Sequence, residues 1–128
     1  MTGILRFSRI VPTEDGGSRF VDAELALTGR TLVTGVPEMA AAGISAAATV
    51  TYLRSAQFDS EPHPGPARQW VVMLRGVIEV TTSDGVRRRF GPGDLVHVED
   101  TDGRGHITTG VEAAPFEGLS VPTTESKS

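Results

Sequence analysis

The sequence predicts an all-β domain, a double-sheet jelly roll closed into a small barrel. Three observations lead to this prediction. Residues with β propensity, or alternating apolar and polar residues, occur in about eight short segments. Glycine and proline, 15 and 8 residues of the 128, separate these segments. No apolar repeat of helical period predicts a helix longer than about two turns.

Length, composition and charge limit the classes of protein to consider. A chain of 128 residues fits a single domain, which we place at 1–121, with a core over 46–121 and a disordered tail over 122–128. The sequence holds no cysteine, which excludes disulfides and thiolate metal sites. The net charge of −4 argues against nonspecific nucleic-acid binding. No apolar run has the length of a membrane span, and no signal peptide is evident. We therefore expect a cytoplasmic protein without nucleic-acid or membrane partners.

The N-terminal residues 1–30 predict strand structure. Val21, Ala23, Leu25 and Leu27 alternate with other residues in a period of two, which indicates a strand near 19–27. An N-terminal strand in a small β-domain needs an edge to pair with, either in its own domain or in a partner. We therefore expect a homodimer that shares strands, exchanging those of 1–30, or that shares a sheet face.

The middle of the chain combines an ambiguous segment with a stiff loop. Alanines over 37–48 favour a helix start, but glycine and serine interrupt them, so we predict a loop with at most one helical turn. A strand at about 46–54 follows. Three prolines at alternate positions from 62 to 66 then hold the next loop extended. This loop presents His63 from a rigid support.

The strongest strand signal spans 70–81, rich in valine and isoleucine. Gly76 interrupts it, which suggests a bulge or a bend at a barrel corner. The turn Ser83-Asp84-Gly85 closes a hairpin. The basic cluster Arg87-Arg88-Arg89 indicates a solvated edge strand rather than a phosphate site. Further strands are predicted near 86–90, 94–99, 105–111 and 115–120.

The stretch from about 55 to 110 resembles the cupin family. The first cupin motif is commonly written G-x5-H-x-H-x3,4-E-x6-G, and His63-x-Gly65-x3-Gln69-x6-Gly76 keeps its spacing. The second is commonly G-x5-P-x-G-x2-H-x3-N; here Gly93-Asp94 opens it and Gly103-x2-His106 closes it after roughly two extra residues. Arg89-Phe90-Gly91-Pro92-Gly93-Asp94 is similar to a common cupin hairpin. The resemblance implies a small bacterial single-domain cupin.

The resemblance also implies a metal site that is half lost. His63 and His106 match two of the family's metal ligands, whereas Gly65 stands where a second histidine would be and Gln69 where a glutamate would be. Glycine offers no ligand, and an amide brings no charge. No cofactor is firmly predicted; a divalent metal (Zn, Fe, Ni or Mn) would bind weakly, through His63, Gln69 and His106, with water or substrate completing its shell.

Candidate catalytic residues follow from the same positions. His106 and His63 would carry acid–base chemistry, for which imidazole is suited near neutral pH, and Gln69 would orient a substrate carbonyl. If Gln69 points inward, Val71 and Met73 do too, and Trp70, Val72 and Leu74 face a second layer or a partner. The sequence does not decide which faces His97 and Tyr52 occupy. The residues predicted to line the pocket are Tyr52, Arg54, Val71, Met73, His97 and Thr108.

Three functions remain open from the sequence. The first is an enzyme acting on a small organic molecule, a cyclase or isomerase of secondary metabolism, working by acid–base chemistry in the barrel pocket. The second is a metal-dependent cupin oxygenase with a reduced ligand set. The third is a cupin that binds a ligand without turning it over. Fold alone does not choose between them.

Overall fold

The computed structural model describes residues 3–31, 34–35, 37–42, 49–55, 65, 67–111 and 115–123. In these residues the secondary structure is β without any helix, which confirms the predicted all-β class. No helix in the described ranges is long and apolar enough to cross a membrane. The strands are β1 (Gly3–Pro12), β2 (Ser18–Arg30), β3 (Met39–Ala41), β4 (Thr51–Ser55), β5 (Gln69–Arg75), β6 (Ile78–Thr82), β7 (Arg87–Phe90), β8 (Leu95–Val98), β9 (His106–Gly110) and β10 (Phe116–Pro122).

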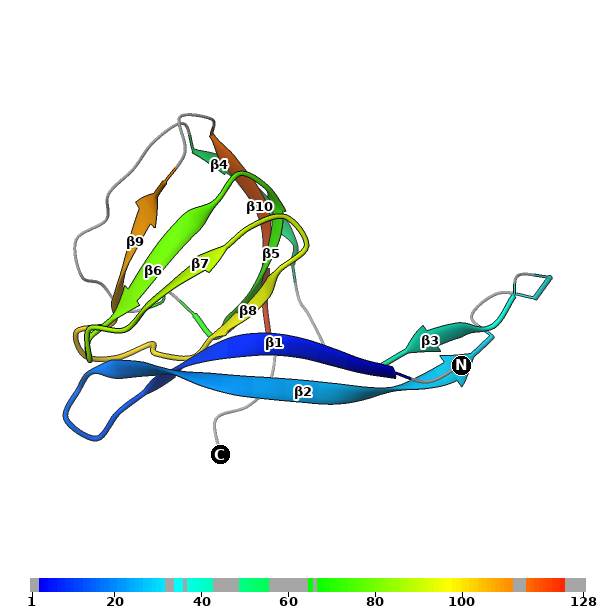
Figure 1. Cartoon of the computed structure of the whole chain (residues 1–128), viewed down its shortest axis with the longest axis horizontal. Coiled ribbons are helices and arrows are strands. Elements are labelled where there is room, and N and C mark those ends of the chain that lie inside the picture. Colours follow the sequence, from blue (N-terminus) through cyan, green and yellow to red (C-terminus); the bar gives the residue numbers. More distant parts are fainter. Residues whose placement is uncertain are drawn as a thin grey trace.

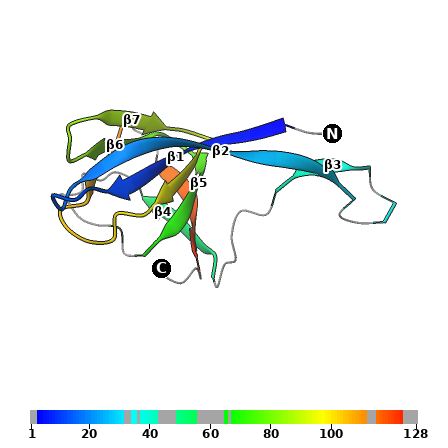
Figure 2. The same ribbon diagram turned by 90° about the horizontal axis from the view of Figure 1, so that it is seen from below.

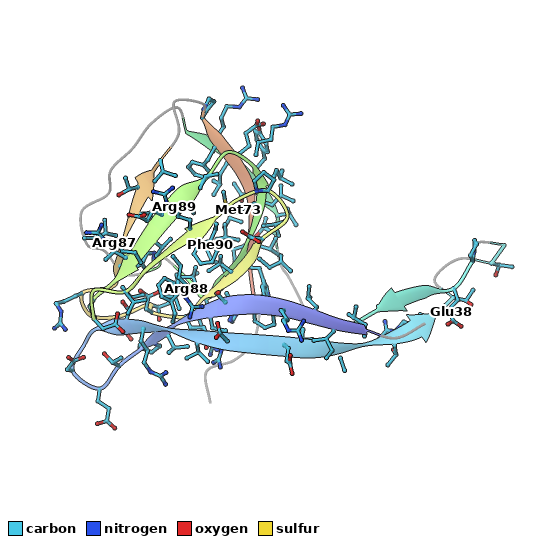
Figure 3. All side chains as sticks on the ribbon, viewed as in Figure 1. Glu38, Met73, Arg87, Arg88, Arg89 and Phe90 are labelled. Carbon is cyan, nitrogen blue, oxygen red and sulfur yellow. The ribbon has the colours of Figure 1, made fainter. Side chains whose placement is uncertain are left out.

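The strands form two sheets that pack face to face (Figure 1). The larger sheet has seven strands in the order β3-β2-β1-β8-β5-β10-β4, and the smaller has three in the order β7-β6-β9. Every described pairing is antiparallel except β1 with β8. Apolar side chains from both sheets fill the space between them, as Met73 and Phe90 show in Figure 3. The core consists of Ile10, Met73, Ile78, Val80, Phe90, Val96 and Val98.

Strand alternation gives the seven-stranded sheet two distinct faces. We call the face toward the three-stranded sheet the inner face and the opposite one the outer face. Met73 is buried in the core and Val71 packs against it, so the predicted inward pair is confirmed. Trp70 and Val72, at the intervening positions of β5, therefore lie on the outer face.

The β1–β2 hairpin extends beyond the sandwich. Its register runs without a break from Gly3 opposite Leu27 to Pro12 opposite Ser18. Only Ser8–Ile10 of β1 pair with β8, so the earlier residues of β1 run past the sheet. Figures 1 and 2 show this part projecting from the sandwich, with β3 at its far end. We call residues 3–7 of β1 and their partners 23–27 of β2 the arm.

The structure corrects the prediction for 37–48 in the described part of that segment. Met39–Ala41 form strand β3, not a loop or a helical turn, and pair with residues 28–30 of β2. The pairing of β1 with β2 stops at Leu27, and the described pairing of β2 with β3 covers the three residues that follow. Residues 43–48 lie outside the described ranges, and the predicted strand at 46–54 is described as Thr51–Ser55.

Two further predictions concern chain ends and bends. Gly76 has a φ of +75° between β5 and β6, which confirms the predicted bend. The predicted tail begins too early, because Pro122 pairs with Gln69 and the Thr123 N–H donates to the Arg68 carbonyl at 3.0 Å. Pro122 ends its strand, where a missing N–H is tolerated. Residues 124–128 lie outside the described ranges.

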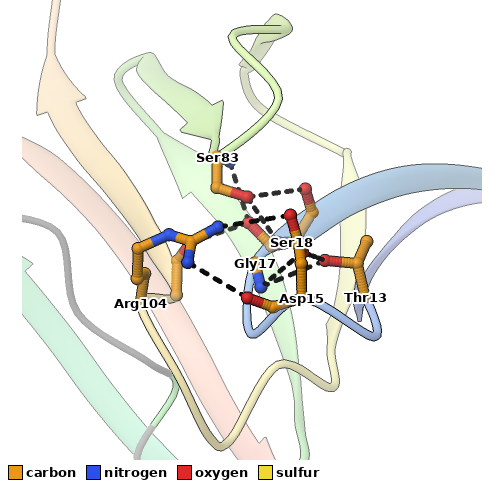
Figure 4. A network of polar contacts seen from close by, with 7 residues as sticks. Thr13, Asp15, Gly17, Ser18, Ser83 and Arg104 are labelled. Atoms are coloured by element: carbon orange, nitrogen blue, oxygen red, sulfur yellow. Dashed lines mark hydrogen bonds and ion pairs between the residues drawn. The ribbon is translucent and has the colours of Figure 1, made fainter.

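The closed end of the β1–β2 hairpin is clamped to two loops of the sandwich (Figure 4). The Ser18 N–H donates to Ser83 Oγ at 2.7 Å, and Ser18 Oγ donates to the Gly105 carbonyl at 2.7 Å. The Arg104 N–H donates to the Gly16 carbonyl at 2.8 Å. Ser18 is fully buried. These bonds fix the loop directly before His106.

The arginine cluster lies on β7, which is an edge strand of the smaller sheet, as predicted. Arg87 and Arg89 are exposed, and Arg89 pairs with Glu79 at 3.2 Å. Arg88 differs, because its side chain is half-buried between β7 and β1 (Figure 3). It donates to Asp22 at 2.7 Å and to Ser8 Oγ at 3.0 Å. Arg88 therefore ties the edge of the small sheet to the hairpin.

Candidate active site

A buried histidine–carboxylate pair lies at one end of the sandwich. His106 begins β9, and its Nδ1 lies 2.6 Å from Asp100 Oδ2. Asp100 has no exposed surface and His106 is 7% exposed. Because a carboxylate only accepts hydrogen bonds, Nδ1 carries the proton and donates it. Asp100 therefore sets both the tautomer and the orientation of the imidazole.

Four of the predicted site residues share the inner faces with His106. Thr108 follows His106 at a spacing of two and lies opposite the core residue Val80. On the other sheet, Gln69, Val71 and Met73 alternate toward the interior, as predicted. Gln69 lies opposite the core residue Val98 and accepts a hydrogen bond from Ser120 Oγ through its Oε1. This bond fixes the side-chain amide.

The position that would hold the family's second histidine has no room for a side chain. Gly65 is buried, and its N–H donates to the Asp100 carbonyl at 2.8 Å. A Cβ at Gly65 would lie 2.6 Å from Val98 Cγ1, so any larger residue would have to displace the core. Among the described residues, no three histidine or acidic side chains are grouped as metal ligands. The residues at these positions therefore do not fit the four-ligand metal site that the cupin resemblance implies.

A second histidine–carboxylate pair lies on the outer face. His97 Nδ1 is 2.8 Å from Glu99 Oε2, and Arg9 holds both oxygens of that carboxylate, at 2.6 and 2.8 Å. Arg68 Nη2 adds a third cationic contact at 3.2 Å. The His97 ring lies 4.5 Å from the Trp70 ring, measured between centroids. We call these residues, apart from Trp70, the Glu99 cluster.

The Glu99 cluster makes stability sensitive to acid. Burial alone would raise the pKa of Glu99, but hydrogen bonds from Arg9 and His97 outweigh it and lower that pKa to about 2. A carboxyl with a lowered pKa in the folded state stabilises the fold above its unfolded pKa, and this contribution is lost as pH falls. The stabilisation from Glu99 is therefore lost as the pH falls from about 4.5 to about 2.

We expect Glu99→Gln to destabilise the fold at pH 7 and to flatten the loss of unfolding free energy between pH 4.5 and 2. Urea unfolding at a series of pH values measures both effects. Glu14→Gln, in the exposed β1–β2 turn, is the matched control and should keep the wild-type slope. An unchanged slope in Glu99→Gln would show that the cluster does not bind its proton differently in the two states.

Three predicted site residues are not brought together with His106. Tyr52 and Arg54 lie on the exposed strand β4, where both contact Glu117. Tyr52 is opposite Leu119, which is itself opposite the outer-face residue Val72, so this pair lies on the outer face. His97 also lies on the outer face, within the Glu99 cluster. His63, predicted as a catalytic residue and as a weak metal ligand, lies outside the described residues.

One described cavity is a groove away from His106. It has a volume of about 750 Å³ and runs between the hairpin and the edge of the small sheet. Its lining residues are Arg6, Phe7, Ser8, Asp22, Ala23, Glu24, Arg88, Arg89, Phe90, Gly93, Asp94 and Leu95. The predicted pocket residues are not among them, so this groove is separate from the candidate active site.

Sequence reasoning missed the two carboxylates that hold the histidines. Asp100 and Glu99 are adjacent at the end of β8, and alternation directs them to opposite sides of the sheet. The His97-x-Glu99 spacing was the available signal, because residues two apart on a strand share a face.

A comparison with protein-family models and one with curated proteins both found no match to this chain.

Proposed function

We propose that this chain is a cupin-type enzyme of the cytoplasm that acts on a small organic molecule in a jelly-roll barrel, as a cyclase or isomerase. One observation supports this proposal above the others, namely the buried pair of His106 and Asp100 on the interior side of β9. A histidine oriented by a carboxylate is a general base and acid of the kind that moves protons near neutral pH.

The chemistry assigned to each residue follows from its contacts. Asp100 keeps the proton on His106 Nδ1, so Nε2 is the nitrogen that takes a proton from the substrate and returns it elsewhere. The carboxylate also stabilises the imidazolium formed in between. Gln69, whose Oε1 accepts from Ser120, directs its amide NH₂ group as a donor for a substrate carbonyl. Val71 and Met73 supply an apolar wall.

A metal-dependent oxygenase is the second candidate, and one contact favours it. Histidines that bind metals usually donate their other ring N–H to a carboxylate, as His106 does to Asp100. The same contact therefore serves both candidates, although Gly65 removes one family ligand. A ligand-binding cupin without turnover is the third possible result of the experiment below.

Hydrogen exchange tests the proposal without knowledge of the product. The protein is incubated in D₂O with a panel of small carbonyl compounds that bear an acidic α-hydrogen, and deuterium incorporation is followed by NMR. We expect incorporation with at least one compound, unaffected by a chelator. Oxygen uptake that requires one bound metal would favour the oxygenase, and saturable binding without exchange would favour the binding protein.

We also propose a homodimer. The outer face of the larger sheet carries the half-buried apolar residues Leu5, Phe7, Val72 and Leu119. Leu74 is 42% exposed. Large apolar sheet faces of this kind mark interaction surfaces. Light scattering at micromolar concentration should give twice the mass of the chain, and a monomer would contradict the proposal.

A further inference from the structure

One edge of β1 is open along the arm. β1 pairs with β2 along its whole length, but its other edge pairs with β8 only from Ser8 to Ile10. In the described part of the chain, no strand lies beside that edge from Gly3 to Phe7. Figure 1 shows these residues in the projecting part of the hairpin. An open strand edge is a template for pairing with another chain.

One hydrogen bond between β1 and the end of β8 shows which residues of β1 point their N–H and C=O groups toward the open edge. The Ile10 carbonyl accepts from the Glu99 N–H at 2.8 Å, so Ile10 directs its backbone groups toward the β8 side. The β1–β2 register has no irregularity, and backbone groups alternate sides along a strand. Ile4 and Arg6 therefore direct their N–H and C=O groups to the open edge, whereas Leu5 directs its own toward β2.

We propose that two copies of the chain pair through this edge, with β1 antiparallel to its copy about a two-fold axis at Leu5. This register places Ile4 opposite Arg6 of the partner subunit, as two hydrogen-bonded pairs related by symmetry. Leu5 then faces Leu5 of the partner subunit as a non-hydrogen-bonded pair, with Cα atoms about 4.5 Å apart. The inference rests on the homodimer proposed above and places its contact at the arm, beside the outer-face residues Leu5 and Phe7 and away from Val72 and Leu119.

Charge and length both fit this pairing. Arg6 faces an isoleucine, so no like charges are opposed. The paired stretch ends at Phe7, and the sandwich begins at Ser8, so neither sandwich occupies the paired stretch. The opposite edge of the hairpin is less suitable. There, a two-fold pairing centred on Ala23 would set Asp22 against Glu24 of the partner subunit.

Cysteine cross-linking tests the register, because the chain holds no cysteine. In the proposed pairing, the Cα separation at Leu5 lies within the range of a disulfide. We expect Leu5→Cys to form a covalent dimer on mild oxidation, seen on a non-reducing gel. Ile4→Cys and Arg6→Cys, one residue to either side, are the matched controls and should cross-link far less. Ala23→Cys tests the β2 edge.

A proline variant supplies an independent measurement. The Arg6 N–H points to the open edge, so Arg6→Pro removes a donor to the partner and leaves the ladder with β2 intact. Two bonds are lost in each dimer, and the dissociation constant should rise at least about tenfold.

The results of these two experiments distinguish a failure of the β1 pairing from a failure of the homodimer proposal. A native dimer that cross-links best through Ala23→Cys, or equally through all variants, would overturn the β1 pairing and leave the dimer standing. A native dimer whose dissociation constant is unchanged by Arg6→Pro would overturn it as well. A wild-type monomer would overturn both proposals.

Discussion

Gly76→Ala is expected to lower the free energy of unfolding by about 3 kcal/mol or more. Gly76 has a φ of +75°, a conformation that costs an L-residue about 1–2 kcal/mol. An added Cβ would lie 2.6 Å from Phe116 Cα and 2.8 Å from the Pro115 carbonyl oxygen. Both are backbone atoms, which cannot rotate away, so overpacking adds about 1–3 kcal/mol. Urea unfolding monitored by tryptophan fluorescence measures the loss.

Gly85→Ala is the matched control for this prediction. Gly85 has a similar φ of +87°, but no atom lies within 4 Å of a Cβ built there. It should therefore show only the conformational cost, about 1–2 kcal/mol. Equal losses in the two variants would mean that β10 can move away from the bend, contrary to the tight contact at Phe116.

The elements that sequence predicted correctly depend on local rules. The strand signal over 70–81, its interruption at Gly76 and the turn at residues 83–85 all follow from residue types near one another in the chain. β3 could not be predicted in this way. It pairs with the part of β2 that extends beyond β1, and that overhang is a property of the tertiary structure rather than of residues 39–41.

The face occupied by His97 shows a second limit. Val96 and Val98 flank it, and a buried flanking pair indicates that the histidine points the other way. The outer face also carries apolar residues, including Trp70 beside His97, so hydrophobicity alone could not identify the interior. The contact between Glu99 and Arg9 joins residues 90 positions apart, and no local pattern predicts it.

The sequence pointed to His106 as a candidate site residue because the spacing Gly103-x2-His106 lies within adjacent loop and strand positions. It did not point to Asp100, because the contact of Asp100 with His106 depends on the loop over 101–105 folding back to β9. The clamp from Ser18 to Gly105 holds that loop, and Ser18 comes from the other end of the chain. The candidate site therefore required three segments to be placed in space before its second member could be recognised.

His106→Ala is expected to reduce proton exchange on any substrate found in the D₂O panel by about 10²–10⁴-fold, the range typical of a lost general base. We expect a larger loss than for His63→Ala, because His106 occupies the better-matched motif position. Asp100→Asn should also reduce exchange strongly while nearly preserving volume. An amide can donate to Nδ1 and so favours the wrong tautomer of His106.

The readout must separate a lost proton carrier from a lost fold, since Asp100 is fully buried. The pH profile of exchange provides this separation, because a variant that only unfolds keeps the wild-type profile in its folded fraction. Thr109→Val, on the opposite face of β9 from His106, is the matched control and should retain most of the activity. Chelation should change the wild-type rate little. One tightly held metal per chain, with activity lost on chelation and restored by that metal, would replace the acid–base mechanism by the metalloenzyme. Full activity in His106→Ala would remove this histidine from either mechanism.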